Sequence, residues 1–230
     1  MKTVGFIGAF DKTDLIMNIA KALIDLDQRV LVIDTTILGK SKYIVPSISP
    51  TKSYMSNFEK IDFAFGFENL EEIYKYVALE QEKDTHELPY DYILFDIDSG
   101  EYFSKFNLQN ANANYFVTAF DLYSLKRGMA IIDEIKVPVK LTKVLFSYEI
   151  TKNDEDYLEF LSLERNVVWN DYSIYFTLLR EDSQAMEENQ RVAQIRLKRL
   201  TNEYKESLAI IVQDIIGDIN INRVRKIIKG

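Results

Sequence analysis

Three short segments of the sequence hold residues that could bind small charged groups. Residues 8–14 (GAFDKTD) combine a glycine with lysine, threonine and two acids, directly before an amphipathic stretch. Asp34 and Asp96 each close a short apolar run. Open α/β sheets place their ligands at the ends of strands, and the start of a helix favours an anion. The sequence therefore predicts one shared site at which these segments meet.

The elements that position these residues alternate between strands and helices, which is typical of a parallel sheet covered by helices. Apolar runs predict strands at Thr3–Ile7, Arg29–Asp34, Ile61–Phe67, Tyr92–Phe95, Tyr115–Ala119, Leu141–Phe146 and Ser173–Phe176. Helical spacing predicts helices over residues 12–26, 69–83 and 189–212. We expect a doubly wound α/β fold with about seven mostly parallel strands and helices on both faces. Thr3–Ile7 is expected between the strands that end at Asp34 and Asp96.

The composition is that of one globular domain. Hydrophobic residues make up 47% of the 230 residues and charged residues 28%, and no linker-like segment divides the chain. We expect a domain over residues 1–217 and a basic tail over residues 218–230. No apolar run approaches the roughly 18 residues of a membrane span, so the expected location is the cytoplasm. The lack of cysteine excludes a disulfide framework, and the net charge of −8 argues against generic adhesion to DNA.

Taken in order, the three segments resemble the ParA/MinD family of P-loop ATPases. The family's phosphate loop, KGGxGKT, is matched in part by Gly8, Lys12 and Thr13, and its continuation L-x-x-N-[LI]-A by residues 15–20. The family's I-D-x-D element is half matched by residues 33–36 (IDTT). Its Y-D-x-I-x-x-D-x-x-x-G element is matched by residues 90–100. The resemblance spans residues 1–215 and implies a P-loop NTPase-like fold.

The resemblance also implies roles for individual side chains. Lys12 would contact the phosphates of ATP, and Thr13, Asp34 and Asp96 would lie at a bound magnesium ion. The residues alone leave a second interpretation open. Lys12 could be an ordinary first-turn residue of a solvent-facing helix, and the two aspartates could be strand-end carboxylates that cap neighbouring turns.

Four positions depart from the family pattern. Ile7 stands where the family has the lysine that reaches the phosphates of a partner subunit, and Ala9 and Asp11 replace two loop glycines. Thr36 replaces the aspartate that positions the attacking water. Glycines let the N–H groups of the loop turn inward around a phosphate, and a carboxylate in the loop repels it. We therefore expect ATP and magnesium to bind weakly or not at all, and we assign no catalytic residue.

Asp11 suggests how the helix is stabilised without a nucleotide. It stands directly before the helix expected from Lys12, so its carboxylate can accept from the N–H of Thr13 or Asp14 as an N-cap. Such a cap contributes about 1 kcal/mol. We interpret Asp11 as a built-in mimic of the phosphate anion, and Gly8, Lys12 and Thr13 as a vestigial nucleotide site.

Two functions are consistent with the resemblance. The first is a positioning or scaffold protein with impaired or absent ATP hydrolysis, serving a segregation, division-site, pilus, flagellar, secretion or conjugation machine. The alternative is an active ATPase of the same family with a variant loop and a nucleotide-driven dimer cycle. In the first case we expect protein partners and, because Ile7 cannot make the cross-subunit phosphate contact, a homodimer that does not depend on ATP.

Two charged segments lie outside this site. Residues 219–230 hold four basic and no acidic residues, and their apolar residues recur at helical spacing: Ile221, Val224, Ile227 and Ile228. Some family members end in such a helix on anionic membrane, so the resemblance implies a peripheral contact with the inner membrane face. The alternative is a last helix packed on its own domain. The acidic run 153–156 (NDED) is expected to start a helix, or to contact a basic partner.

Overall fold

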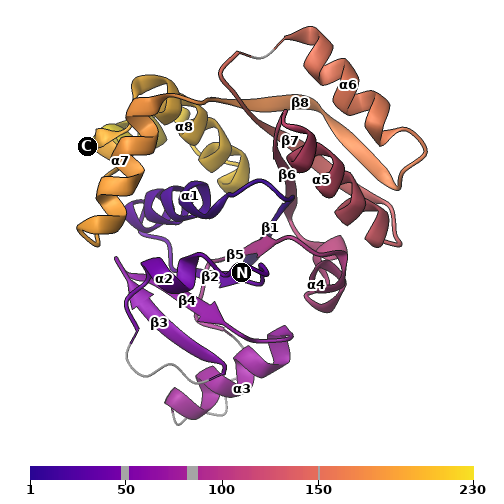
Figure 1. Cartoon of the computed structure of the whole chain (residues 1–230). Coiled ribbons are helices and arrows are strands. Elements are labelled where there is room, and N and C mark those ends of the chain that lie inside the picture. Colours follow the sequence, from indigo (N-terminus) through magenta and orange to yellow (C-terminus); the bar gives the residue numbers. More distant parts are fainter. Residues whose placement is uncertain (48–51, 82–87, 150) are drawn as a thin grey trace.

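The computed structural model describes residues 1–47, 52–81, 88–149 and 151–230, and over these residues the chain forms one eight-stranded sheet between two layers of helices (Figure 1). The strands are β1 (Lys2–Ile7), β2 (Val30–Asp34), β3 (Tyr54–Phe58), β4 (Ile61–Phe65), β5 (Tyr92–Ile97), β6 (Ala113–Ala119), β7 (Val139–Ser147) and β8 (Val167–Thr177). Their order across the sheet is β3-β4-β2-β5-β1-β6-β7-β8. The described strands pair in parallel except for β3 with β4, so the predicted fold class is confirmed.

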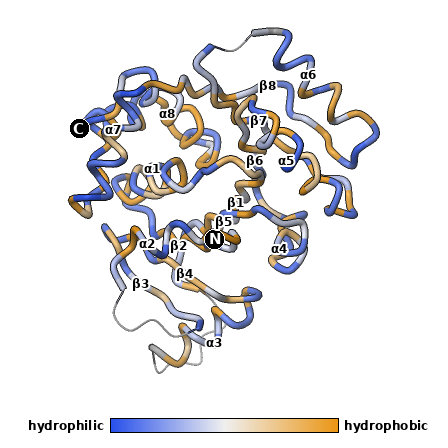
Figure 2. The backbone as a smooth tube through the Cα atoms, in the orientation of Figure 1, coloured by the Kyte–Doolittle hydropathy of each residue, from blue (hydrophilic) through white to orange (hydrophobic). Residues whose placement is uncertain are grey.

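The helices cover both faces of the sheet. They are α1 (Thr13–Asp25), α2 (Ser41–Ile44), α3 (Leu70–Gln81), α4 (Gly100–Lys105), α5 (Leu122–Glu134), α6 (Lys152–Ser162), α7 (Arg180–Arg191), α8 (Asn202–Ile216) and α9 (Ile221–Lys229). Helices α1, α8 and α9 share one hydrophobic cluster, and α3, α4, α5 and α6 contribute to a second one. Figure 2 shows apolar and polar residues alternating along α1 and α8, as expected for helices with one buried side. Central strands buried on both faces read as continuous apolar runs.

The order of the central strands corrects one expectation. Strand β1 lies between β5 and β6, and β2 pairs with the far side of β5, so the expectation that β2 borders β1 is wrong. Every residue of β2 and of β5 is buried, so the apolar character of the two strands does not tell which of them borders β1. The register still aligns Asp34 with Asp96 and Asp96 with Phe6. Both carboxylates therefore reach the edge of the sheet where the loop after β1 begins.

Two local predictions are wrong. Strand β3 falls in a segment where no strand is predicted, because its mostly half-exposed residues at a sheet edge carry little apolar signal. The helix expected over residues 189–212 is broken: α7 ends at Arg191, Ala193 has φ +50°, and α8 begins at Asn202. The segment between the two helices is non-helical apart from a short 3-10 turn. Three of its apolar residues are buried: Ile195, Leu197 and Leu200.

The C-terminal helix α9 packs on the domain. Val224 and Ile228 are buried, and Ile221 and Ile227 are half-buried against the same cluster that holds α1 and α8. The apolar face of α9 thus packs on the domain, as the alternative expects, and the contact with a membrane stays a prediction. Among the described residues, none of the helices is both long and apolar enough to span a bilayer.

Candidate functional site

The loop between β1 and α1 depends on Gly8. This residue has φ +142°, and a Cβ on it would lie 2.2 Å from the carbonyl oxygen of Val117 in β6. Any side chain would force the two strands apart, so glycine is required here by close backbone approach. Ile7, which precedes it, is buried at the end of β1. The first position of the family motif therefore belongs to the core of this protein.

Lys12 is held by the protein itself. Its side chain is 3% exposed, and Nζ lies 2.8 Å from Oδ1 of Asp96. It also donates a hydrogen bond to the carbonyl of Gly8 at 2.8 Å. The interpretation of Lys12 as a solvent-facing residue is therefore wrong. Two of the three donors of the ammonium group can thus be used inside the protein, by a carboxylate and a carbonyl.

Asp96 has an unusual proton affinity because it is buried beside other acids. Burial raises the pKa of Asp96 to about 6, with the Lys12 ammonium opposing the rise and the Asp34 carboxylate adding to it. A buried carboxylate is tolerated only if it is paired or protonated. The contact with Lys12 supplies that pairing. Lys12 and Asp96 thus form a buried ion pair at the position expected for the phosphate lysine.

Asp11 lies two residues before α1, so the predicted N-cap is one residue off: the N-cap is Lys12, which makes no side-chain capping bond. The helix begins at Thr13, whose N–H donates to Oδ1 of Asp11 at 3.1 Å. The second carboxylate oxygen of Asp11 accepts a hydrogen bond from Nζ of Lys40 at 2.7 Å, and Lys40 also reaches Asp14 at 3.4 Å. Burial works against the ionised form, but Lys40 and Thr13 together hold the pKa of Asp11 below its ordinary value. The carboxylate is thus a bound anion at the helix start, with its own counter-ion.

Lys40 was not predicted as a site residue. It lies in the segment between β2 and α2, in a stretch without apolar periodicity, so its sequence context gives no signal beyond its charge. Interactions with Asp11 and Asp14 raise its pKa, although burial opposes them. Lys40 therefore stays protonated and spans the loop of β1 and the first turn of α1.

Asp34 is also engaged by its neighbours. One oxygen accepts from the N–H of Thr36 at 2.9 Å and from the Thr36 hydroxyl at 2.6 Å, and the other accepts from the hydroxyl of Ser41. Asp34 therefore caps the turn after β2, as the second interpretation holds. Thr36 faces this carboxylate in place of the family's second aspartate. In the described part of the chain, no group of three His, Cys, Asp or Glu residues could hold a metal ion.

The space that remains at this edge of the sheet is small. The cleft measures about 90 Å³, whereas ligand pockets usually measure roughly 300–1,000 Å³. Its walls include five of the six predicted site residues, and Asp34 is the exception; the walls are Gly8, Ala9, Phe10, Asp11, Lys12, Thr13, Thr36, Leu38, Lys40, Asp96 and Asp98. In this arrangement a phosphate or a magnesium ion would have to displace contacts that Lys12, Asp96, Asp11 and the N–H of Thr13 make with their neighbours.

Several solved structures with the same architecture are MinD or plasmid partition proteins. The chain superposes on MinD of Pyrococcus horikoshii in complex with Mg-ADP at a TM-score of 0.61, with 14% identity over 94% of this chain and 96% of that one. For the MinC:MinD cell division complex of Aquifex aeolicus the TM-score is 0.59, with 14% identity over 96% and 97% of the two chains. A putative plasmid partition protein of Borrelia burgdorferi bound to AMPPNP gives 0.58, with 12% identity over 94% and 98%.

These structures define the fold of the chain as that of the ParA/MinD P-loop ATPases. No family model matches the sequence, and no curated protein matches it. With identities this low, the likeness concerns the fold. What the cleft of this chain does must be argued from its own residues.

Proposed function

We propose that the chain is a positioning or scaffold protein on the ParA/MinD fold and does not use ATP hydrolysis. One observation carries this proposal: the ammonium group of Lys12, which the fold offers to a phosphate, is bound to Asp96 and Gly8 inside the protein. A nucleotide would have to break this buried pair before it gained a phosphate contact. Breaking a buried ion pair leaves an uncompensated charge, which is strongly unfavourable.

The start of α1 adds a second barrier to nucleotide binding. The carboxylate of Asp11 accepts the N–H of Thr13, which would otherwise be free for a phosphate. A phosphate charge within about 5 Å of this carboxylate would be repelled by roughly 3 kcal/mol at an effective dielectric of about 20. Lys40 neutralises Asp11 only while it remains in the cleft. Asp11 and Lys40 thus act as a permanent internal substitute for the ligand.

A protein of this kind would act through its contacts with other proteins. The structural neighbours include a cell division protein in complex with MinC and a plasmid partition protein. By analogy of fold, we propose that this chain also positions or anchors components of a larger assembly, such as a segregation, division-site, pilus, flagellar, secretion or conjugation machine. Its role there would be set by its surfaces rather than by a nucleotide cycle.

Self-association separates this proposal from an active ATPase. Because Ile7 is buried in the core, no lysine at that position reaches a second subunit. We expect the molar mass of the chain, measured by light scattering, to be the same with and without ATP and magnesium. A monomer that dimerises only after ATP is added would overturn the proposal. The same samples should release no phosphate above a Lys12→Ala control, whereas an active ATPase would.

A further inference from the structure

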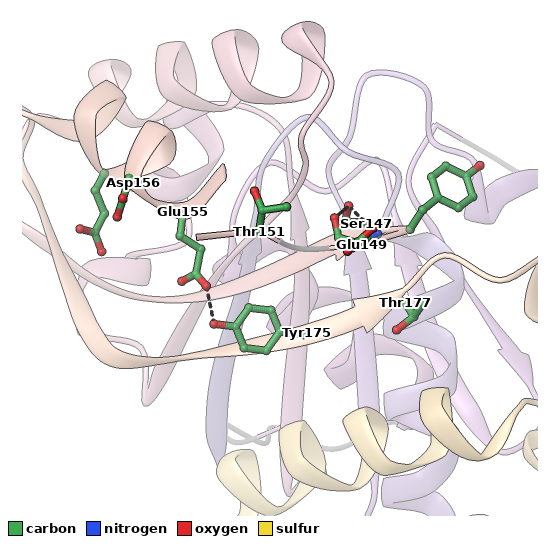
Figure 3. A pocket seen from close by; sticks show the side chains of 9 residues that line it. Ser147, Glu149, Thr151, Glu155, Asp156, Tyr175 and Thr177 are labelled. Atoms are coloured by element: carbon green, nitrogen blue, oxygen red, sulfur yellow. Dashed lines mark hydrogen bonds between the residues drawn. The ribbon is translucent and has the colours of Figure 1, made fainter. Parts of the chain in front are cut away.

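A second hollow opens at the same edge of the sheet, between α6 and the ends of β7 and β8 (Figure 3). It measures about 570 Å³, which lies in the usual range for binding pockets and far exceeds the cleft beside Gly8. Its walls are Ser147, Tyr148, Glu149, Thr151, Glu155, Asp156, Glu159, Tyr175 and Thr177. We call it the acidic hollow. Glu155 and Asp156 belong to the acidic run 153–156, for which the sequence leaves contact with a basic partner open, whereas none of the residues predicted for the nucleotide site lies in it.

The charges of the acidic hollow are largely unbalanced. Among the side chains that the structure describes, Glu149, Glu155 and Asp156 make no ion pair, and only Glu159 has a cation, Lys143, at 2.7 Å. The hydroxyl of Tyr175 donates to Glu155 at 2.6 Å and fixes that carboxylate at the wall (Figure 3). Residues 149–171 contain seven acids and two bases, so the surrounding surface is negative as well. Such a surface attracts cations and repels nucleic acid or free phosphate.

Apolar side chains lie exposed next to these carboxylates. Tyr148 is 82% exposed at the hollow, and Phe160, one turn after Asp156 on α6, is 65% exposed. Aromatic side chains with one wet end are enriched at protein interfaces, and their ring faces attract lysine and arginine. An acidic surface that faces only solvent would have no reason to expose aromatic side chains. Together with the volume of the hollow, they indicate a surface that is covered by a protein segment.

The open edge of the sheet limits how that segment can bind. Strand β8 is the last strand and pairs only with β7 among the described strands. Its outer edge beside the hollow is partly capped, because the hydroxyl of Ser207 donates to the carbonyl of Tyr175. Addition of a further strand would lose this bond. A partner therefore has to be held by side chains that enter the hollow.

We propose that the acidic hollow binds a basic segment of a partner protein. In this arrangement an arginine or lysine enters between Glu155 and Asp156, while neighbouring apolar residues cover the rings of Tyr148 and Phe160. Arginine fits best, because its planar group can pair with a carboxylate in two places and stack on a ring. The absence of a three-ligand cluster in the described residues argues against a metal ion as the occupant. This inference does not depend on how the cleft beside Gly8 treats nucleotides.

The test uses a fluorescent peptide in which arginine alternates with leucine and serine, and its twin with citrulline in place of arginine. Fluorescence anisotropy with the full chain should show binding of the arginine peptide, which weakens as salt is added, and much weaker binding of the twin. The double variant Glu155→Gln/Asp156→Asn should lower the affinity about tenfold, since each exposed ion pair is worth up to roughly fivefold. Tyr148→Ser, at an exposed position, should also weaken binding.

A matched variant separates a specific site from the general negative charge of the chain. Asp27→Asn/Asp218→Asn removes two exposed acids without a described ion pair, in the turns after α1 and α8 at the opposite edge of the sheet, where Lys2 at the start of β1 bonds the carbonyl of Ile216. We expect this variant to bind like the wild-type protein. Equal weakening in both double variants would overturn the proposal, and so would equal binding of the two peptides. Either result would leave the nucleotide measurements, and the proposed function, unaffected.

Discussion

The cleft beside Gly8 and the acidic hollow lie at the same edge of one sheet, yet their charges are arranged in opposite ways. In the cleft, Lys12 is paired with Asp96 and Asp11 with Lys40, and about 90 Å³ remains. The hollow has about 570 Å³, and most of its carboxylates have no cation among the described side chains. Paired charges stabilise the fold, whereas unpaired charges are free to meet a partner. The place at which the family binds its ligand therefore differs from the place at which we propose that this chain binds a partner protein.

The largest expected effect comes from breaking the buried pair of the cleft. Lys12→Met leaves the carboxylate of Asp96 buried without a counter-ion, which should cost about 3–5 kcal/mol in the free energy of unfolding measured with urea. The double variant Lys12→Met/Asp96→Leu removes both charges and should recover most of this loss. A single variant that costs no more than an exposed pair, about 1 kcal/mol, would show that the pair does not hold the cleft closed.

The second effect is a pH dependence of stability caused by Asp96. Its pKa of about 6 in the folded protein lies above the ordinary value of 3.8, so the folded state binds the proton more tightly than the unfolded state. The stability from this group is fully present below about pH 4 and is lost as the pH rises through about 6. The full change is about 3 kcal/mol, at 1.36 kcal/mol per pKa unit. Urea unfolding of the wild-type protein and of Asp96→Asn should show this slope only in the wild type.

A smaller effect is expected for the anion at the start of α1. Asp11→Ala removes the acceptor for the N–H of Thr13 and the partner of Lys40, and should cost about 1 kcal/mol in thermal or urea unfolding. Asp11→Asn keeps an acceptor for Thr13 and loses the charge, so it should cost less. If the two variants were equally destabilised, the charge rather than the capping bond would be the stabilising feature.

The smallest effect is expected in the acidic hollow. Glu155→Gln/Asp156→Asn should change the free energy of unfolding by no more than about 0.5 kcal/mol, because these carboxylates make no described ion pair. The control variant Asp27→Asn/Asp218→Asn should change the free energy of unfolding by a similarly small amount. If the free energy of unfolding fell as much as in Lys12→Met, the carboxylates of the hollow would stabilise the fold like those of the cleft, and the contrast between the two regions would not hold.

Much of the fold could be predicted because buried strands appear in the sequence as runs of apolar residues. The strands β1, β2 and β5 are mostly apolar and buried, and the apolar run 92–95 is followed directly by Asp96, the carboxylate that meets Lys12. The edge strand β3 has no such apolar run, since its residues are mostly half-exposed. The break between α7 and α8 was missed for a different reason. Buried apolar residues in a non-helical segment there happen to repeat at helical spacing.

Most residues of the cleft could be predicted from the sequence, but the ion pairs that they form could not. Gly8, Asp11, Lys12, Thr13 and Asp96 do line one cleft, as the motif positions indicate. Sequence spacing, however, carries no information on which charge neutralises which. Lys40 reaches Asp11 from 29 residues away, and no pattern in its segment marks it. Of the acidic hollow, the sequence indicates only the acidic run 153–156, because the remaining walls come from two strand ends that only the fold brings next to this helix.

The most direct test of this account is calorimetric titration of ATP with magnesium into the wild-type protein and into Ala9→Gly/Asp11→Gly. The double variant restores two loop glycines and removes the internal anion, so it should bind the nucleotide measurably better at a slight loss of thermal stability. The account predicts no detectable heat of binding for the wild-type protein up to millimolar ATP. Binding of ATP at micromolar concentration by the wild-type protein would contradict it, because Lys12 and Asp11 would then have to exchange their internal partners for a phosphate.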